Sequence, residues 1–203
     1  MTRPYRADRR SGSPALLVPM MAALLALALA GFASAAPGLS LEALLAEIGG
    51  KPSQEARFEE KKYLAVLDAP VESSGVLRYQ APGRLEKHTE RPQAESMILD
   101  GDLVVLQRDG RKRSLPLAQI PGVAALVGGL RDTLAGDASA LRDRFKVVVQ
   151  GDERRWQIDL LPSDPASATL VSKITLIGSA GRLDEVQTLQ ADGDRSVMKL
   201  SPK

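Results

Sequence analysis

The hydrophobic pattern divides the chain into strands on both sides of one helical stretch, between about residues 116 and 145. Apolar residues recur there at spacings of three and four, which places them on one face of a helix: Val123, Leu126, Val127, Leu130 and Leu134. Pro121 suits a first turn, while Gly128-Gly129 weakens the helix locally. A second short helix should follow, with Asp137 as its N-cap. The residues alone leave open whether this insert completes a permanent core or forms a movable lid.

Elsewhere, apolar and polar residues alternate, as expected of strands that bury one face. The connections are short, and the pairs Asp100-Gly101 and Asp109-Gly110 favour type I′ hairpin turns. Short connections predict an antiparallel meander, and about eleven strands are more than an open sheet usually carries without curling. We therefore predict an α+β fold that is mainly β, with a strongly curved antiparallel sheet or unclosed β-barrel. A short helix at residues 41–48 precedes the sheet, and the helical insert should lie on the concave side.

The first 35 residues have the pattern of a cleaved signal peptide. Four arginines precede an apolar run, and Ala33-Ser34-Ala35 matches a signal-peptidase site. A membrane-anchoring helix is the alternative, but the apolar run is short and contains Pro19. We therefore expect residues 1–35 to be removed and residues 36–203 to form one domain in the periplasm.

Removal of the leader changes the charge balance. The leader contributes four Arg and one Asp, a net +3, so the formal charge falls from +2 for the whole chain to −1. The pI of about 9.0 therefore does not indicate a nucleic-acid-binding surface. The sequence contains no cysteine, so packing without disulfides must stabilise the fold.

Residues with catalytic or metal-binding chemistry are sparse. His88 is the only histidine, and a solvated strand face explains its neighbours Glu86 and Glu90. Ser196 and Lys199 match the S-x-x-K spacing of acylating serine enzymes, but on a strand these two side chains point to opposite faces. No cysteine–histidine cluster or complete calcium-binding loop is present in the sequence. We therefore expect that the protein is not an enzyme and that it has neither a metal site nor a cofactor.

A basic stretch around the second Asp-Gly pair is the strongest charge feature of the mature chain. Its residues Arg108, Arg111, Lys112 and Arg113 could dock on anionic lipid head groups or on an acidic partner. A solvated strand edge that prevents aggregation is the alternative interpretation.

The order of these elements resembles the outer-membrane lipoprotein carrier (LolA) family over nearly the whole mature chain. The most specific parts are G-V-L-R-Y-Q-A-P-G-R-L (residues 75–85), E-S-M-I-L-D-G-D-L-V-V-L (residues 95–106) and D-G-D-R-S-V-M-K-L (residues 192–200). The resemblance implies an unclosed β-barrel with a helical lid, which carries acylated lipoproteins across the periplasm. It also implies an inner-membrane transporter as donor and an outer-membrane acceptor. We expect the carrier to be a monomer.

Two departures from the family pattern suggest a divergent member. The family's functional arginine, just before the proline of the second strand, corresponds to Ala81, and neither Arg78 nor Arg84 aligns with it. The chain also ends at Lys203 without the family's usual C-terminal extension. We therefore expect the cargo to be a lipoprotein or a related acylated lipid. Exposing its acyl chains to water costs about 0.8 kcal/mol of free energy per CH₂.

Such a carrier would hold acyl chains in an aliphatic cavity between the sheet and the insert. Candidates for the apolar side of the sheet are Val76, Tyr79, Leu85, Met97, Leu99, Val104, Leu106, Phe145, Val147, Trp156 and Ile158. They cannot all share one face, because Val76 and Tyr79 have opposite parity. The five apolar residues of the insert would form the lid. Two alternatives remain: a lipid-sensing module that binds a regulatory partner, and a hydrolase of envelope esters.

Overall fold

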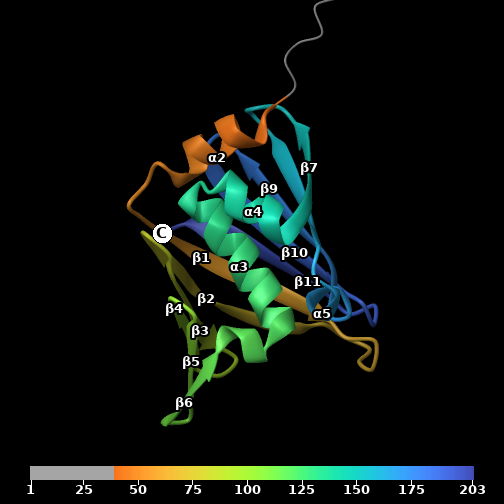
Figure 1. Ribbon diagram of the computed structural model, residues 1–203. Coiled ribbons are helices and arrows are strands. Elements are labelled where there is room, and N and C mark those ends of the chain that lie inside the picture. Colours follow the sequence, from red (N-terminus) through yellow and green to blue (C-terminus); the bar gives the residue numbers. More distant parts are fainter. Residues whose placement is uncertain (1–38) are drawn as a thin grey trace, which may run out of the picture. The chain divides into compact units, whose positions relative to one another are not determined.

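The computed structural model of the protein describes residues 39–203, so the predicted signal peptide lies outside the described residues. Figure 1 shows a large sheet with helices packed across one face. The strands are β1 (Ser53–Tyr63), β2 (Val71–Gln80), β3 (Arg84–Arg91), β4 (Glu95–Asp100), β5 (Leu103–Arg108), β6 (Arg111–Pro116), β7 (Phe145–Gly151), β8 (Trp156–Pro162), β9 (Val171–Ser179), β10 (Arg182–Gln190) and β11 (Arg195–Pro202). The helical segments are α2 (Leu41–Gly49), η1 (Leu117–Gln119), α3 (Pro121–Ala135), α4 (Ala138–Arg144) and α5 (Pro165–Ala168).

The eleven strands form one antiparallel sheet in the order β6-β5-β4-β3-β2-β1-β11-β10-β9-β8-β7. Strands β1 and β11 pair at its centre, and we call β1–β6 the first wing and β7–β11 the second wing. The free edges are therefore β6 and β7, the two strands that flank the insert of η1, α3 and α4. The predicted mainly β fold with an unclosed antiparallel sheet is confirmed.

The strand register shows which residues share the inner face of the sheet, against which the helices pack. Tyr79 lies opposite Leu85, Leu85 opposite Leu99, and Leu99 opposite Val104, so these side chains point the same way. The same reasoning places ten of the eleven predicted residues on the inner face: Tyr79, Leu85, Met97, Leu99, Val104, Leu106, Phe145, Val147, Trp156 and Ile158.

Val76 is the exception, and its prediction as an inner-face residue is wrong. It lies opposite Arg57 on β1 and His88 on β3, so its side chain points to the outer face. It is nevertheless buried, with 5% of its surface exposed. Because it does not belong to the hydrophobic core cluster, burial alone does not identify the inner face here.

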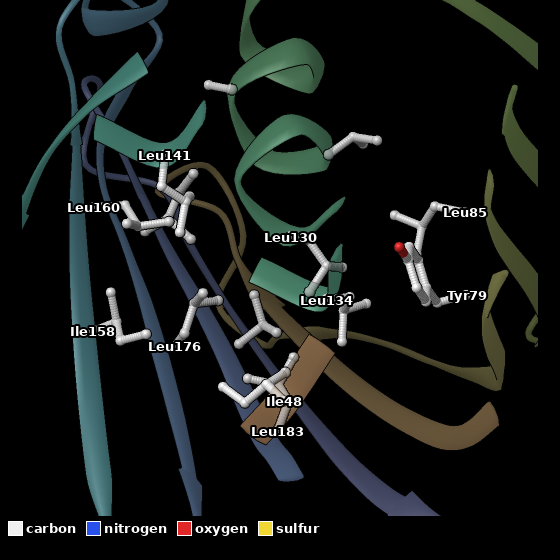
Figure 2. Close-up of a cluster of buried hydrophobic side chains, with 14 of the residues drawn as sticks. Ile48, Tyr79, Leu85, Leu130, Leu134, Leu141, Ile158, Leu160, Leu176 and Leu183 are labelled. Carbon is white, nitrogen blue, oxygen red and sulfur yellow. The ribbon is translucent and has the colours of Figure 1, made fainter. Parts of the chain in front are cut away.

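The N-terminal helix α2 and the insert form one core with the sheet. Helix α2 begins at the predicted place, since the Ser40 hydroxyl accepts a hydrogen bond from the Ala43 amide at 3.1 Å. Helix α3 contacts β3 in the first wing and β9 in the second. In Figure 2, Leu130 and Leu134 of α3 lie between side chains from both wings: Tyr79 and Leu85 on one side, Ile158, Leu160 and Leu176 on the other.

The two halves of α3 differ in burial. From Val127 to Leu134 the helix is buried at every residue except Arg131, whereas Val123 and Leu126 are only half-buried. Helices α2 and α4 also contact α3, and they cover residues that an amphipathic helix would expose. The C-terminal half of α3 is therefore part of the core, and only its N-terminal half has the partial exposure expected of a cover.

Close backbone contacts hold the C-terminal half of α3. A Cβ at Gly129 would lie 3.0 Å from Leu160 Cδ1, and a Cβ at Gly49 would lie 2.6 Å from Gly136 Cα. Helices α2 and α3 therefore touch through their glycines, and Gly136, with φ of +77°, ends α3 in the left-handed conformation. The Gly128-Gly129 pair lies within a continuous helix, where glycine permits close packing.

A buried carboxylate joins α3 to α4. Asp132 has 4% of its surface exposed, and its Oδ1 accepts a hydrogen bond from Arg131 Nε at 3.0 Å. Arg144 Nε lies 3.1 Å from Oδ2, but it is not aligned to donate a hydrogen bond, so this contact is an ion pair. The two guanidinium groups compensate for the cost of burying the carboxylate.

The two predicted hairpin turns have different outcomes. Asp109 and Gly110 have φ values of +52° and +72°, as a type I′ turn requires. At the other hairpin, Asp100 pairs with Leu103, so the turn residues are Gly101 and Asp102, and the predicted pair is shifted by one residue. Within residues 39–203, no helix has both the length and the apolar character needed to span a bilayer.

Candidate functional site

An apolar cavity of about 510 Å³ lies beneath the N-terminal half of α3. Its walls come from the start of α3, the α5–β9 connection, and the central strands β1, β10 and β11. Eight of its lining residues are aliphatic or proline: Leu64, Ile120, Pro121, Val123, Leu126, Leu170, Val171 and Met198. This volume falls within the range of about 300–1,000 Å³ that is typical of ligand pockets.

A buried ion pair forms part of the cavity wall. Glu60 has 4% of its surface exposed, and one of its oxygens lies 2.5 Å from Lys87 Nζ. Lys62 Nζ lies 3.8 Å from the other oxygen, and Lys87 Nζ sits 4.8 Å from the ring centre of Phe58. Sequence reasoning missed this pair, although Glu60 shares the parity of Phe58 on β1 and so had to face inward.

A second hollow, which we call the basic groove, adjoins the apolar cavity. Its volume is about 530 Å³, and it shares the lining residues Lys62 and Lys87 with the cavity. Five of its lining residues are cationic and two are acidic: Lys62, Lys87, Arg108, Arg111 and Arg113, with Glu95 and Asp109. The groove lies along the inner face of β3–β6, at the edge of the first wing.

The predicted basic patch is therefore divided between two faces of the sheet. Leu106 lies opposite Arg113, and Arg108 lies opposite Arg111, so these three arginines follow the inner face. Lys112 lies opposite Gln107 and has the other parity. Of the four residues of the predicted patch, only the three arginines line the basic groove. Met97 and Leu106, two of the predicted sheet residues, line it as well.

The predicted lid residues separate into two groups. Val123 and Leu126 line the apolar cavity, whereas Val127, Leu130 and Leu134 are 2–5% exposed and belong to the core. Sequence reasoning missed several cavity residues, notably Leu170, which lies between α5 and β9 and has no periodic pattern around it. Met198 was missed as well, because its place opposite Glu60 follows from the non-local pairing of β1 with β11.

None of the ten inner-face candidates lines the apolar cavity, and all ten belong to the hydrophobic core or pack against it. Tyr79 lines a smaller cavity of about 230 Å³, together with Leu134 and Leu183. Burial raises the pKa of the Tyr79 hydroxyl above its usual value, and the nearby Arg131 opposes this effect. The smaller cavity lies at the anchored end of α3, whereas the apolar cavity lies at its opposite end.

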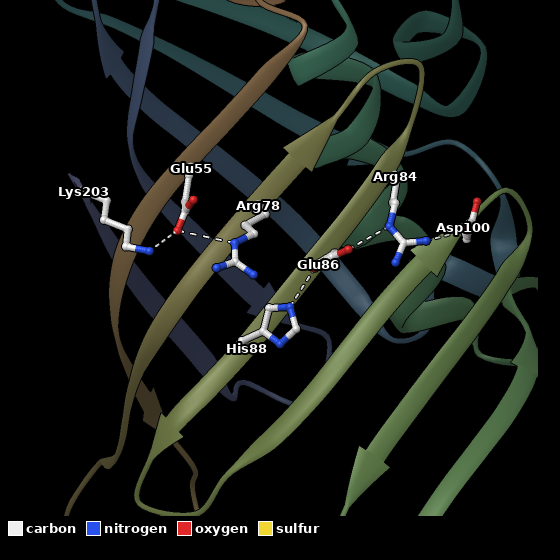
Figure 3. Close-up of polar contacts among 7 residues, drawn as sticks. All are labelled: Glu55, Arg78, Arg84, Glu86, His88, Asp100 and Lys203. Carbon is white, nitrogen blue, oxygen red and sulfur yellow. Dashed lines mark hydrogen bonds and ion pairs between the residues drawn. The ribbon is translucent and has the colours of Figure 1, made fainter.

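The outer face of the first wing carries a network of ion pairs (Figure 3). Glu86 Oε2 lies 2.7 Å from His88 Nε2, and Glu86 Oε1 accepts a hydrogen bond from Arg84 Nε at 2.7 Å. Arg84 also donates to Asp100 at 2.7 Å. These contacts give His88 a structural role on a solvated strand face. The hydrogen bond to His88, followed by the one to Arg84, lowers the pKa of Glu86 below its usual value.

The two arginines near Ala81 do not reach α3. Arg78 Nε lies 3.4 Å from Glu55 on the outer face, and Arg84 belongs to the network just described. The contact between α3 and the β2–β3 turn comes instead from the helix, because a Cβ at Gly83 would lie 3.2 Å from Arg131 Cδ.

The arrangement of polar residues limits the chemistry that the sheet can support. On β11, Ser196 lies opposite Lys62 on the inner face, while Lys199 lies opposite Glu59 and has the other parity. Their side chains therefore cannot act on one another. Among residues 39–203, no group of three or more His, Cys, Asp or Glu side chains is placed to hold a metal ion.

Comparison with known proteins gives one family match and several distant relatives. The family model described as outer membrane lipoprotein carrier protein LolA-like matches residues 33–201. A curated outer-membrane lipoprotein carrier protein of Pseudomonas syringae pv. tomato (strain ATCC BAA-871 / DC3000) is 26% identical over 131 residues, which are 62% of this chain. The match spans 58% of the length of that relative.

The solved structures that resemble this chain are more distant in sequence. A LolA superfamily protein from Nitrosomonas europaea has a TM-score of 0.43 and 11% identity, with 80% of this chain and 92% of that chain covered. A putative outer membrane lipoprotein-sorting protein domain from Vibrio parahaemolyticus has a TM-score of 0.45 and 10% identity, with 81% and 90% covered.

Proposed function

Because this chain belongs to the family of LolA-like outer membrane lipoprotein carrier proteins, we propose that it binds acylated lipoproteins or a related acylated lipid. It would act in the periplasm as a monomer, without catalysis. The inner membrane would supply its cargo through a transporter, and an outer-membrane acceptor would receive it. The curated relative's name, outer-membrane lipoprotein carrier protein, supports this direction of transfer.

The apolar cavity beneath the N-terminal half of α3 carries this proposal. An acyl chain of about fifteen methylenes costs on the order of 12 kcal/mol when it is exposed to water. A cavity of about 510 Å³ with eight apolar wall residues offers such a chain a place to avoid that cost. The polar residues that share the wall would keep the cavity from holding the chain too tightly for release.

The unequal anchoring of α3 supports a lid whose N-terminal end moves. Its C-terminal half is held by α2, by Leu160 and by the Asp132–Arg144 ion pair. At the other end the contacts are weaker: the Ser167 hydroxyl lies 3.4 Å from the Pro121 carbonyl, and Gly122 faces Leu170. Val123 and Leu126 would therefore swing away from the cavity while the rest of the helix stays in the core.

A binding experiment with a blocked cavity tests the proposal. The mature protein is purified from a periplasm and analysed by native mass spectrometry, and bound lipid or lipoprotein is expected. Leu126→Trp fills the cavity and should weaken binding of a fluorescent acylated probe roughly tenfold or more. Val148→Trp is the matched control, because Val148 is 39% exposed on β7 and an indole there remains outside the core.

Transfer separates a carrier from a lipid-sensing module. A carrier releases its probe to acceptor vesicles, whereas a sensor retains it until a partner binds. Empty protein from the native periplasm, together with equal probe binding by wild type and Leu126→Trp, would refute the proposed cavity.

A further inference from the structure

The apolar cavity and the basic groove together have the form of a site for an amphiphile. They share Lys62 and Lys87, so one molecule can extend from one hollow into the other. The cavity side is lined by aliphatic residues from α3, β9 and β11, whereas the groove side is dominated by cations. A single ligand that fills both must have an apolar chain and an anionic end.

The charge of the groove is poorly compensated by its own protein neighbours. Arg108 and Arg111 lie directly opposite one another, which is unfavourable for two cations. Glu95 and Asp109 both approach Arg108, at 3.9 and 3.8 Å. Among the described residues, no ion pair engages Arg111 or Arg113, and both side chains are exposed. An anion in the groove would therefore relieve repulsion and gain charge-assisted hydrogen bonds.

The junction between the two hollows keeps one positive charge, because a single carboxylate faces two lysines. The Lys87 ammonium donates a hydrogen bond to Glu60 Oε2 at 2.5 Å, and Lys62 Nζ lies 3.8 Å from Glu60 Oε1. The Glu60 carboxylate offsets the charge of Lys87, which has only 17% of its side chain exposed. Lys62, whose side chain is 50% exposed, therefore adds its charge to those of Arg111 and Arg113, and an anionic head group would gain most from these three cations.

We infer that the basic groove is a head-group subsite for an anionic phospholipid whose acyl chain occupies the apolar cavity. Arg111 and Arg113 bind the phosphate, and Arg108 supports them from the neighbouring strand. This inference rests on the proposed function, because it requires the acyl chain to enter beneath α3. It adds a preference for the charge of the head group, which the cavity alone does not provide.

The test compares two lipids with the same acyl chains. Binding of phosphatidylglycerol and of phosphatidylcholine is measured with the full mature protein at low ionic strength. We expect the anionic lipid to bind roughly fivefold more tightly, as two partly exposed ion pairs allow. The preference should decline as salt is raised from about 10 to 500 mM, because solvent-exposed charges are screened.

Paired substitutions locate the preference. Arg111→Gln with Arg113→Gln should abolish it, and should weaken phosphatidylglycerol binding far more than phosphatidylcholine binding, because the choline ammonium already compensates the phosphate of phosphatidylcholine. Lys112→Glu lowers the net charge by the same two units on the opposite face of the same strand, so it should retain the preference. Equal binding of both lipids by the wild-type protein would overturn the inference, and so would equal losses in the Lys112 and double variants. The wild-type salt dependence decides the question without any variant.

Two further arms separate the possible failures. If neither lipid binds, the proposed function fails and the head-group subsite fails with it. If phosphatidylcholine binds but no preference exists, only the subsite fails. Inorganic phosphate, titrated into lipid-free protein, should bind weakly, in the millimolar range or above. Tight phosphate binding that depends on Arg111 and Arg113 would make the groove a site for free anions and overturn the lipid assignment.

Discussion

A disulfide across the mouth of the apolar cavity tests whether α3 moves. A Cβ at Gly122 would lie 3.4 Å from Leu170 Cβ, close to the separation of about 3.5–4.5 Å found in disulfides. The double variant Gly122→Cys/Leu170→Cys should therefore oxidise with little strain. The native sequence has no cysteine, so no competing disulfide can form. The link would fasten the N-terminal end of α3 to the α5–β9 connection.

The magnitude of the stabilisation follows from the length of the closed loop. A loop of about 49 residues loses on the order of 4 kcal/mol of unfolded-state entropy when it is cross-linked. Leu170 is 45% exposed, so its replacement costs about 1 kcal/mol of apolar burial. We expect a net gain of about 3 kcal/mol, which raises Tm by roughly 6–12 °C for a domain of this size.

The functional result is measured on the same protein. Transfer of a fluorescent acylated probe to acceptor vesicles should slow at least about tenfold in the oxidised form. It should recover fully when dithiothreitol reduces the link, and this reduced protein is the matched control. If oxidised protein of raised Tm transfers the probe as fast as reduced protein, the N-terminal half of α3 does not open. The helix would then be core along its whole length.

Three substitutions test the packing and the charges that hold the fold. Gly129→Val should cost about 2 kcal/mol, because its side chain meets Leu160 in a packed core. Asp132→Asn should cost roughly 2 kcal/mol, since it removes the charge of a buried carboxylate that pairs with the partly buried Arg131 and the exposed Arg144. The pKa of Glu86 is lowered in the folded state, mainly by its hydrogen bond with His88. The ionised carboxylate therefore stabilises the protein at pH values above its usual pKa of 4.5. That stability is lost as the pH falls through the lowered folded-state pKa, and Glu86→Gln should lose less stability between pH 7 and pH 3 than wild type.

Urea unfolding provides the measurement for all three, and two further variants serve as controls. Gly128→Ala meets only ordinary contact with Arg144 and should be neutral or stabilising. Glu42→Gln breaks a fully exposed ion pair with Arg142 and should leave the unfolding midpoint unchanged. A Glu86→Gln protein whose acid sensitivity equals that of wild type would contradict the assigned role of this carboxylate.

Much of the sheet could be predicted from local pattern alone. Alternation fixes the face of each side chain once one residue is placed, so ten of the eleven candidates share the inner face. The opposite parity of Val76 and Tyr79 was already visible in the sequence, and the structure assigns Val76 to the outer face. The Asp109-Gly110 turn was predictable because few other residues accept two left-handed conformations in succession.

The cavity could not be predicted because it depends on contacts between distant segments. Periodicity identifies one face of α3, but α2 and α4 cover other faces, so Asp132 and Thr133 are buried as well. Leu170 reaches the cavity from an irregular connection that has no period. The pairing of β1 with β11 is also non-local, and it brings Glu60 opposite Met198.

The pairing of β1 with β11 has a mechanical consequence. Because both free edges flank the insert, the space between the wings can widen without breaking a single hydrogen bond between neighbouring strands. The central strands β1 and β11 then act as a hinge, and the two wings change their curvature on either side of it. The resistance to opening comes from side-chain packing between α3 and the two wings, which a bound acyl chain can replace. The size of the bound cargo would therefore set the distance between the two wings.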